Sequence, residues 1–299
     1  MLSTLCALLL MVEPSVSREL AQNILFLEQP LAAPCDQGEP EGQIRCLITA
    51  RYLKDRVASQ TALELYAQTG TVVGVLPEQD FDGAYRGQLH LVPRLPIAEH
   101  RRHLIAISAA LTDFDAFFAQ LSGTPSFRWR ALEVRVFESV KRKTPSAFAV
   151  GWLVAYNVSG SLFGSDAGVR GTLFHEVFHL NDQAHRQWSS RVLSPIYDRI
   201  VAKCGTKVAC LEPYTPDSIK VRGGTYYDFQ PGNGVHEYGA DLGKRYYLEH
   251  RALQRKEPAL KPFKCMNPEN AKAWRLLVDE FFGGVDLTAD CPTPSRPPP

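Results

Sequence analysis

The 299-residue sequence contains no long apolar run, no long basic run and no internal repeat. Its apolar stretch near the start, residues 2–12, is shorter than the roughly 20 residues that a membrane-spanning helix needs. The formal net charge at pH 7 is only +1, so the sequence lacks the electrostatic signature of a nucleic-acid-binding protein. We therefore expect neither a membrane span nor a nucleic-acid partner.

The seven cysteines include no C-x-x-C pair, which argues against a structural zinc site built from thiolates. Residues 5–12 are apolar and are followed by small residues, as in a secretory signal peptide over residues 1–17. When Cys6 in that segment is set aside, six cysteines remain, and sequential neighbours lie close enough in the chain to close small loops. We expect a secreted or periplasmic protein with disulfide bonds, whose connectivity the sequence leaves open.

What the sequence does contain is an H-E-x-x-H motif, from His175 to His179, within an apolar run that predicts a helix. Residues four apart share one helix face, so both imidazoles can bind one cation. The Glu176 carboxylate then lies beside the cation, where it can act as a base on water. The motif predicts a zinc hydrolase. The alternative is a buried helix whose histidines are satisfied by hydrogen bonds in the core.

Residues 234–249 also have helical character and place Glu237 and Asp241 one turn apart. A carboxylate from this second helix would complete a His₂Glu site and leave the fourth position for water, as a catalytic zinc requires. We assign Asp241 to His175, because an outer carboxylate that accepts the far ring N–H of a ligand fixes its tautomer.

H-E-x-x-H followed at a distance by E-x-x-x-D resembles the gluzincin metallopeptidases, and residues 235–247 are similar to the anthrax lethal factor-like catalytic domains. The resemblance covers only these two helices. It implies a zinc-dependent endopeptidase that acts on a peptide or protein substrate. In that reading His175, His179 and Glu237 bind Zn²⁺, Glu176 activates the water and Asp241 supports the ligands.

His185 is an alternative candidate for the third metal ligand, because it lies where the metzincin pattern H-E-x-x-H-x-x-G-x-x-H has its last histidine. Asp182 stands at the glycine of that pattern and adopts a left-handed conformation less readily. Met266 lies in a cysteine-linked setting and is no clear methionine turn. A metzincin-like peptidase that uses His185 remains an alternative. So do a catalytically inactive zincin-fold binding protein and a secreted structural protein without metal.

A peptidase of this kind also needs a hydrogen-bond donor for the oxyanion of the tetrahedral intermediate. Tyr227 and His236 lie shortly before Glu237 in the sequence and are our catalytic candidates. Residues 222–234 are rich in glycine and predict a mobile loop. The alternative donors are Tyr226, Tyr246 and Tyr247.

The expected fold class is α+β, a single zincin-like domain over residues 18–291 followed by a Pro-rich flexible tail at 292–299. An N-terminal lobe, roughly 18–185, would hold a mixed sheet and the active-site helix, and residues 186–291 would form a mostly helical lobe. Apolar periodicity predicts helices over 44–68, 97–121, 188–204, 237–254 and 270–282, with Asp113 able to start a second helix within the second of these. It predicts strands over 70–76, 87–92, 127–137 and 147–156, the last of which we expect to pair with an extended substrate.

Overall fold

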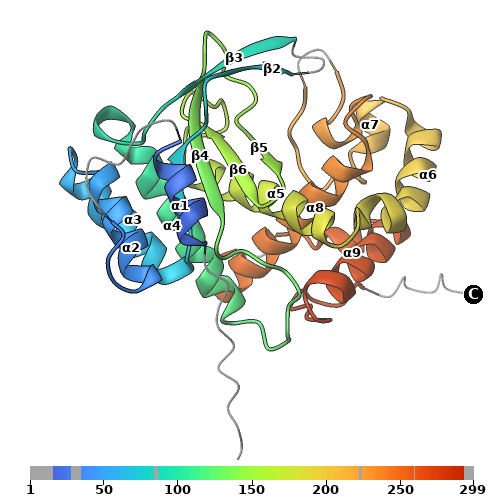
Figure 1. Cartoon of the computed structure of the whole chain (residues 1–299). Coiled ribbons are helices and arrows are strands. Elements are labelled where there is room, and N and C mark those ends of the chain that lie inside the picture. The colour runs from blue at the N-terminus through green and yellow to red at the C-terminus, as the bar shows by residue number, and fades with distance from the viewer. Residues whose placement is uncertain (1–15, 28–34, 84–86, 222–223, 259, 293–299) are drawn as a thin grey trace, which may run out of the picture.

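The computed structural model describes residues 16–27, 35–83, 87–221, 224–258 and 260–292 and has a mixed α+β fold (Figure 1). The predicted fold class is thereby confirmed at the level of α+β. The described α-helices are α1 (Arg18–Leu25), α2 (Pro40–Arg51), α3 (Arg56–Thr69), α4 (Arg101–Phe118), α5 (Asp166–Ala184), α6 (Ser194–Cys204), α7 (Val208–Leu211), α8 (Gly234–Gln254) and α9 (Pro268–Phe281).

The described strands form one mixed sheet with the order β2-β3-β4-β6-β5, and β1 also pairs with β4. Strand β4 runs parallel to β1 and β6, and the other pairs are antiparallel. Strand β5 therefore lies at one edge of the sheet. The bounds are β1 (Val72–Val75), β2 (Gln79–Asp82), β3 (Gln88–Pro93), β4 (Glu133–Ser139), β5 (Ala147–Val150) and β6 (Leu153–Asn157).

The sheet is curled, and its two ends approach each other. Strands β2 and β5 stand at opposite ends of the strand order, yet the ring of Phe81 on β2 stacks on that of Phe148 on β5, with 5.0 Å between centroids. Figure 1 shows the β2–β3 hairpin extending across the top of the molecule toward the C-terminal helices. The hairpin thus passes over the edge strand.

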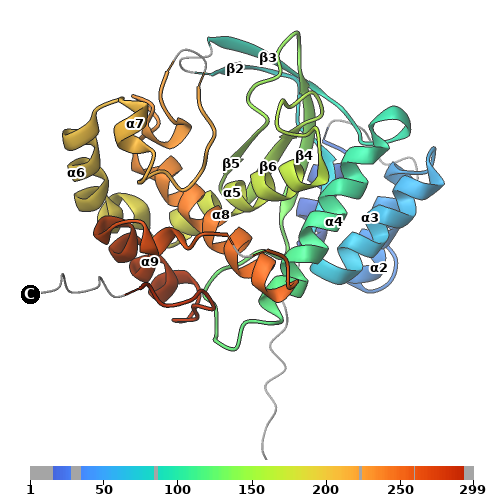
Figure 2. The same ribbon diagram turned by 180° about the vertical axis from the view of Figure 1, so that it is seen from behind.

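The helices lie on two sides of the sheet. Figure 2 shows α2, α3 and α4 on one side and α6, α7 and α9 on the other, with α5 and α8 between them. All the described strands precede α5 in the chain, and the part after α5 is largely helical, as the sequence predicts. The division into two lobes at residue 185 stays a prediction.

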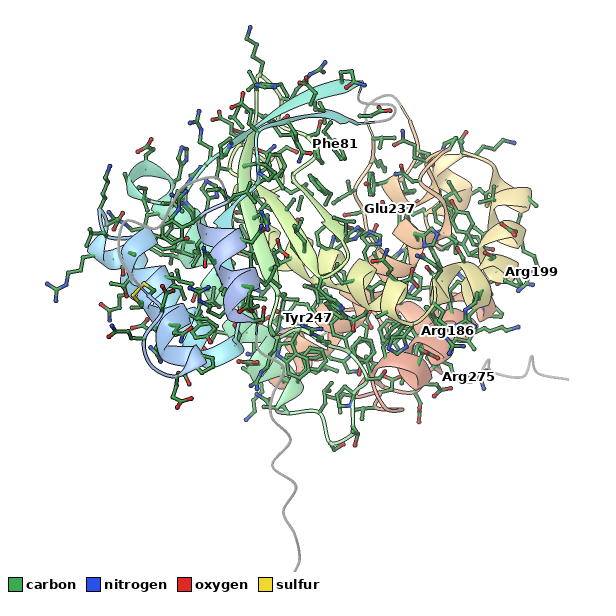
Figure 3. The ribbon with its side chains drawn as sticks, in the orientation of Figure 1. Phe81, Arg186, Arg199, Glu237, Tyr247 and Arg275 are labelled. Atoms are coloured by element: carbon green, nitrogen blue, oxygen red, sulfur yellow. A yellow bond between two sulfur atoms is a disulfide. The ribbon has the colours of Figure 1, made fainter. Side chains whose placement is uncertain are left out.

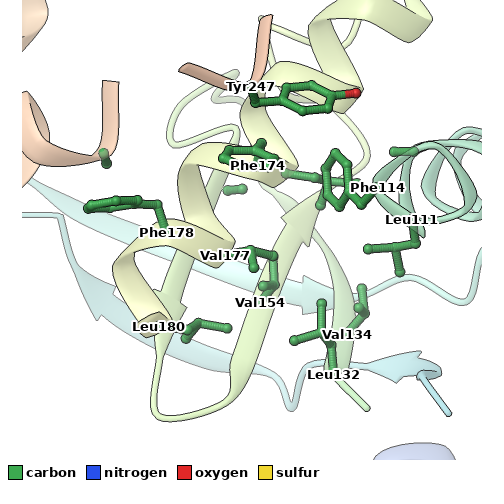
Figure 4. Packing of buried hydrophobic residues seen from close by; sticks show 14 of the residues in the cluster. Leu111, Phe114, Leu132, Val134, Val154, Phe174, Val177, Phe178, Leu180 and Tyr247 are labelled. Carbon is green, nitrogen blue, oxygen red and sulfur yellow. The ribbon is translucent and has the colours of Figure 1, made fainter. Parts of the chain in front are cut away.

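Helix α5 is buried on most of its circumference because it packs on β5, β6, α4 and α8. Val177 and Leu180 point toward the sheet in Figure 4. On another side the ring of Phe174 packs between those of Phe114 and Tyr247, at centroid distances of 5.2 and 4.5 Å. The apolar residues around the H-E-x-x-H motif are therefore core residues that fix the helix in place.

Two glycines let α8 pack closely, Gly243 against α5 and Gly239 against the helical turn Ser189–Leu193 that follows α5. A Cβ added to Gly243 would lie 2.3 Å from Cδ2 of Phe178, and one added to Gly239 would lie 2.9 Å from Cβ of Ser189. A larger side chain at either position would push α8 outward. The carboxylates of α8 reach α5 because these positions carry no side chain.

Several predicted elements have different boundaries in the structure. The helix predicted over 44–68 is broken into α2 and α3, because the Asp55 side chain accepts a hydrogen bond from the Ala58 N–H and caps a new helix. Asp113 does not start a second helix; it lies inside α4, where its carboxylate binds Arg251 and the hydroxyl of Tyr247.

Two predicted strands also differ. The strand predicted over 127–137 begins only at Glu133, because the Asn181 side chain bonds the backbone of Arg128 and holds that residue away from the sheet. The stretch 147–156 is a hairpin instead of one strand, since Gly151 adopts a left-handed φ of 63° at the turn between β5 and β6. The predicted strands at 70–76 and 87–92 correspond to β1 and β3, and β2 was not predicted.

Three disulfide bonds join sequential neighbours among the described cysteines: Cys35–Cys46, Cys204–Cys210 and Cys265–Cys291. They confirm the expectation of disulfides and favour an extracytoplasmic location. Residues 1–15 of the predicted signal peptide and residues 293–299 of the predicted tail lie outside the described residues. None of the helices described is both long and apolar enough to cross a membrane.

Candidate metal centre

Helices α5 and α8 bring three ligand-type side chains together. His175 and His179 lie one turn apart on α5, and their Nε2 atoms are 3.1 Å from each other. Oε2 of Glu237, in the first turn of α8, is 3.0 Å from Nε2 of His175 and 3.5 Å from Nε2 of His179. Figure 3 places Glu237 between the sheet and the C-terminal helices. The ligand atoms of the three residues lie within 4.8 Å of one another, so the group could hold a metal ion.

Hydrogen bonding on the far side of His175 supports this assignment. Nδ1 of His175 lies 2.8 Å from Oδ1 of Asp241, one turn after Glu237 on α8. A neutral His175 that donates its Nδ1–H to this carboxylate presents an unprotonated Nε2 to Glu237 and His179. The unprotonated Nε2 of His175 and the Glu237 carboxylate are then both hydrogen-bond acceptors that face each other. One cation bound between them would interact favourably with both. Two imidazoles and one carboxylate form a donor set that could hold a metal ion.

The surrounding charges favour a cation at this place. Burial acts to lower the pKa of His175, but Asp241 and Glu237 outweigh it and raise that pKa well above its usual value. Burial acts to raise the pKa of Glu237, but hydrogen bonds and charges from both histidines hold it far below its usual range. The same carboxylates that stabilise a proton on His175 would stabilise a metal ion bound there.

Glu176 lies next to the ligands and is buried, with 7% of its surface exposed. Burial raises the pKa of its carboxyl, and the two neighbouring histidines only partly offset this. Such a group takes up a proton more readily than an exposed glutamate does.

A cleft of about 430 Å³ opens beside the three ligand-type residues. It is bounded by the β2–β3 hairpin, strand β5, helix α5 and the start of α8. Its lining residues are Phe81, Asp82, Gly83, Pro145, Ala147, Phe148, Ala149, His175, Glu176, His179, Leu180, Asp182, Gln183, Gln187, Tyr227, His236 and Glu237.

Strand β5 presents backbone hydrogen-bonding groups to this cleft. Asn157 N–H donates to the carbonyl of Ser146, and the register pairs Phe148 with Ala155, so these are the hydrogen-bonded pairs of the β5–β6 ladder. Bonding alternates along an antiparallel strand, so the N–H and C=O groups of Ala147 and Ala149 point away from β6. They face the free edge, and both residues line the cleft.

Both sequence-predicted catalytic candidates line the cleft. The ring of His236 is held on both sides, since Nδ1 lies 3.1 Å from Oδ2 of Asp182 and Nε2 lies 2.9 Å from Oγ of Ser190. Asp182 is itself fixed by the N–H and hydroxyl of Ser189. Tyr227 lies in the short helical turn Tyr227–Phe229 just before α8. The loop predicted over 222–234 thus includes ordered structure, and residues 222–223 lie outside the described part.

From the sequence alone, Asp182 is notable only because it stands where the metzincin pattern has a glycine. In the structure this carboxylate is buried and orients His236. Asp182 lies seven residues after His175 in the motif helix, but Ser189, which bonds it, and His236, which it orients, come from other turns. Only the folded arrangement brings these groups together.

The remaining candidates bind elsewhere. His185 Nδ1 lies 2.6 Å from Oε1 of Glu280, and its ring packs on Phe281 of α9, so it does not join the metal-type group found among the described residues. Tyr246 donates its hydroxyl hydrogen to the carbonyl of Val285. Tyr247 donates to Asp113, and Tyr226 is buried at a β-bridge with Lys220.

No protein-family model matches the chain, and no match to it was found among the curated proteins or the solved structures. The residues and contacts described above are therefore the basis for assigning a function.

Proposed function

We propose that this protein is a zinc-dependent metallopeptidase that hydrolyses peptide bonds. One observation carries the proposal: His175, His179 and Glu237 converge, with Glu176 beside them, at a cleft that is also lined by a strand edge with no partner among the described strands. A buried structural zinc would not need such a cleft, and a core histidine pair would not need the third, carboxylate ligand.

His175, His179 and Glu237 would hold the ion. A bound Zn²⁺ supplies two effects, since it lowers the pKa of water and polarises a carbonyl group. Glu176 takes the proton from the attacking water and then delivers it to the amine that leaves. Asp241 keeps His175 in the tautomer that leaves Nε2 unprotonated.

Tyr227 and His236 are the residues that would stabilise the oxyanion. The Asp182 carboxylate accepts a hydrogen bond from Nδ1 of His236, and Nε2 of the same ring lies 2.9 Å from the Ser190 hydroxyl. These two contacts hold the ring of His236 at the cleft. Tyr227 offers a phenolic O–H in the same cleft.

The substrate would bind as an added strand on β5. Ala147 and Ala149 direct backbone N–H and C=O groups into the cleft. An extended peptide needs such groups to form main-chain hydrogen bonds with a strand edge. Their small side chains leave space between the strand edge and α5. A substrate bound there passes over the ligand histidines, which positions its carbonyl groups near Glu176.

The test is cleavage of an unfolded, labelled protein by the wild type and by Glu176→Gln, each with its zinc content measured. The variant should keep zinc and lose about 10²–10⁴-fold in turnover, the range for removal of a general base. Glu138→Gln is a suitable control, because Glu138 is a half-buried glutamate that binds Arg94 outside the cleft. A Glu176→Gln variant as active as the wild type would defeat the mechanism. A zinc-loaded wild type that cleaves no substrate would indicate a zincin-fold binding protein instead.

A further inference from the structure

Lys244 is a buried cation one turn after Asp241 on α8, with only 14% of its side chain exposed. Its ammonium binds the carboxylate of Asp217 and lies 3.8 Å from Oδ1 of Asp241. Its aliphatic chain crosses the interface with α5, where a Cβ added to Gly171 would be 3.5 Å from Cε of Lys244. One side chain therefore contacts both central helices and the loop that carries Asp217.

On its inner side, Lys244 is one carboxylate away from the candidate metal centre. The same oxygen, Oδ1 of Asp241, lies 2.8 Å from Nδ1 of His175 and 3.8 Å from Nζ of Lys244. Asp241 is 3% exposed and so has little solvent to stabilise its charge. The His175 ring and the Lys244 ammonium together fix the position of the Asp241 carboxylate.

On its outer side, Lys244 holds the segment that leads to Tyr227. Two hydrogen bonds join the beginning of this segment to its end. Oγ1 of Thr215 lies 3.0 Å from the carboxylate of Asp228, and the Tyr227 N–H donates to the carbonyl of Ile219. Asp217 connects this unit to α8 through the ammonium. A displacement of Asp217 is therefore passed to Tyr227 at the cleft.

The ammonium is essential to this arrangement on electrostatic grounds. Asp217 and Asp241 are both largely buried, at 16% and 3% side-chain exposure. Without the cation between them, two carboxylates would face each other away from water, and breaking a buried pair in this way is strongly destabilising. The loop would then move outward to hydrate Asp217.

We propose that Lys244 is a positioning residue that couples the metal centre to the segment carrying Tyr227. This inference rests on the proposed function in that it takes His175, His179 and Glu237 to be the metal site. Zinc binding fixes His175, and with it Asp241, Lys244 and Asp217. The described residues 217–221 and 224–227 become more ordered as a result, and zinc binds more tightly when they are already ordered, by the same coupling.

The experiment is amide hydrogen exchange, read by mass spectrometry on the full chain with and without Zn²⁺. In the wild type, zinc should slow exchange over residues 217–221 and 224–229 by about tenfold, within the usual range of couplings between sites. Lys244→Met should abolish this zinc-dependent slowing, and Lys244→Arg should restore much of it. Lys264→Met is the matched control, because Lys264 is equally buried and binds Asp286 in another part of the fold.

The outcomes separate this inference from the proposed function. If the wild type binds no zinc in a direct titration, both are overturned. If it binds zinc but Lys244→Met shows the same zinc-dependent slowing, only the coupling is overturned. Should Lys244→Met fail to fold, Asp217→Asn decides: it keeps the cation beside Asp241 and removes the outer contact. That variant should bind zinc and lose the slowing, and unchanged slowing would refute the role of Lys244.

Discussion

Replacing Gly243 by alanine should weaken both the fold and zinc binding. The added Cβ would lie 2.3 Å from Cδ2 and 2.8 Å from Cε2 of Phe178. Favourable carbon contacts lie at about 3.5–4.0 Å, so the ring or the helix must move by more than about 1 Å. Phe178 has little room to turn, since it packs against Phe281 at a centroid distance of 5.0 Å. Helix α8 must therefore move away from α5.

The magnitude follows from two opposing effects. Overpacking a close interface costs about 1–3 kcal/mol. Alanine in place of glycine inside a helix gains about 1 kcal/mol. Gly171→Ala isolates the second effect, because Gly171 lies in α5 on the same interface and an added Cβ there would meet only Lys244, at 3.5 Å. We expect the free energy of unfolding of Gly243→Ala to be about 1–3 kcal/mol below that of Gly171→Ala.

The same movement shifts Glu237 and Asp241 relative to His175. Metal–ligand distances tolerate deviations of only about 0.2 Å, so zinc affinity should fall by about tenfold or more. Urea unfolding of the two zinc-free variants and zinc titration against a competing chelator measure the two effects. The reasoning would be refuted if Gly243→Ala matched Gly171→Ala in both stability and zinc affinity.

Two further predictions concern the edge strand and a helix cap. Ala149→Pro removes an N–H that faces the cleft without breaking the β5–β6 ladder; it should raise KM about fivefold, the equivalent of a net hydrogen bond of about 1 kcal/mol. Phe148→Pro, which breaks the ladder, should lower the Tm instead, and an unchanged KM for Ala149→Pro would argue against strand addition. Burial acts to raise the pKa of Asp55, but Arg101 and the N–H groups of Ala98 and Ala58 lower it to about 2. The ionised form is thus favoured by folding, so Asp55 stabilises the protein above pH of about 4, its unfolded pKa, and this contribution is lost as the pH falls toward 2. Asp55→Asn should therefore lower the Tm at pH 7, with a difference from the wild type that shrinks at low pH; a constant difference down to pH of about 2 would contradict this account.

Much of the candidate site could be predicted because its spacing is local. A helix fixes the relation of His175 to His179 and of Glu237 to Asp241, so the sequence alone indicates which side chains share a face. The pairing of Asp241 with His175, expected from this spacing, corresponds to the 2.8 Å contact in the structure. The broad fold class also follows from the apolar patterns.

The rest depends on contacts between distant segments, which periodicity does not record. The close approach of α5 and α8 depends on Gly243, and nothing in its immediate sequence shows that it faces Phe178. Asp182 and Lys244 likewise acquire partners only when separate turns meet. Strand β2 has four residues and only Phe81 to mark it as apolar, so its pattern is too short to recognise.

The missed boundaries have similar causes. Tertiary hydrogen bonds decide them: Asp55 binds Ala98 and Arg101 in addition to its own helix, and Asn181 fixes Arg128. The apolar stretch across Gly151 is continuous in sequence, and only the left-handed backbone of this glycine shows that it is a turn.

The most direct test of the metal centre is zinc per chain by elemental analysis, on the wild type and on Glu237→Ala prepared side by side without added metal. The wild type should carry about one zinc ion and the variant should lose it, because in the proposed site Glu237 is the third of three protein ligands. A variant that keeps its zinc would place the third ligand elsewhere. A wild type that contains no zinc, even after zinc is supplied, would contradict the account as a whole.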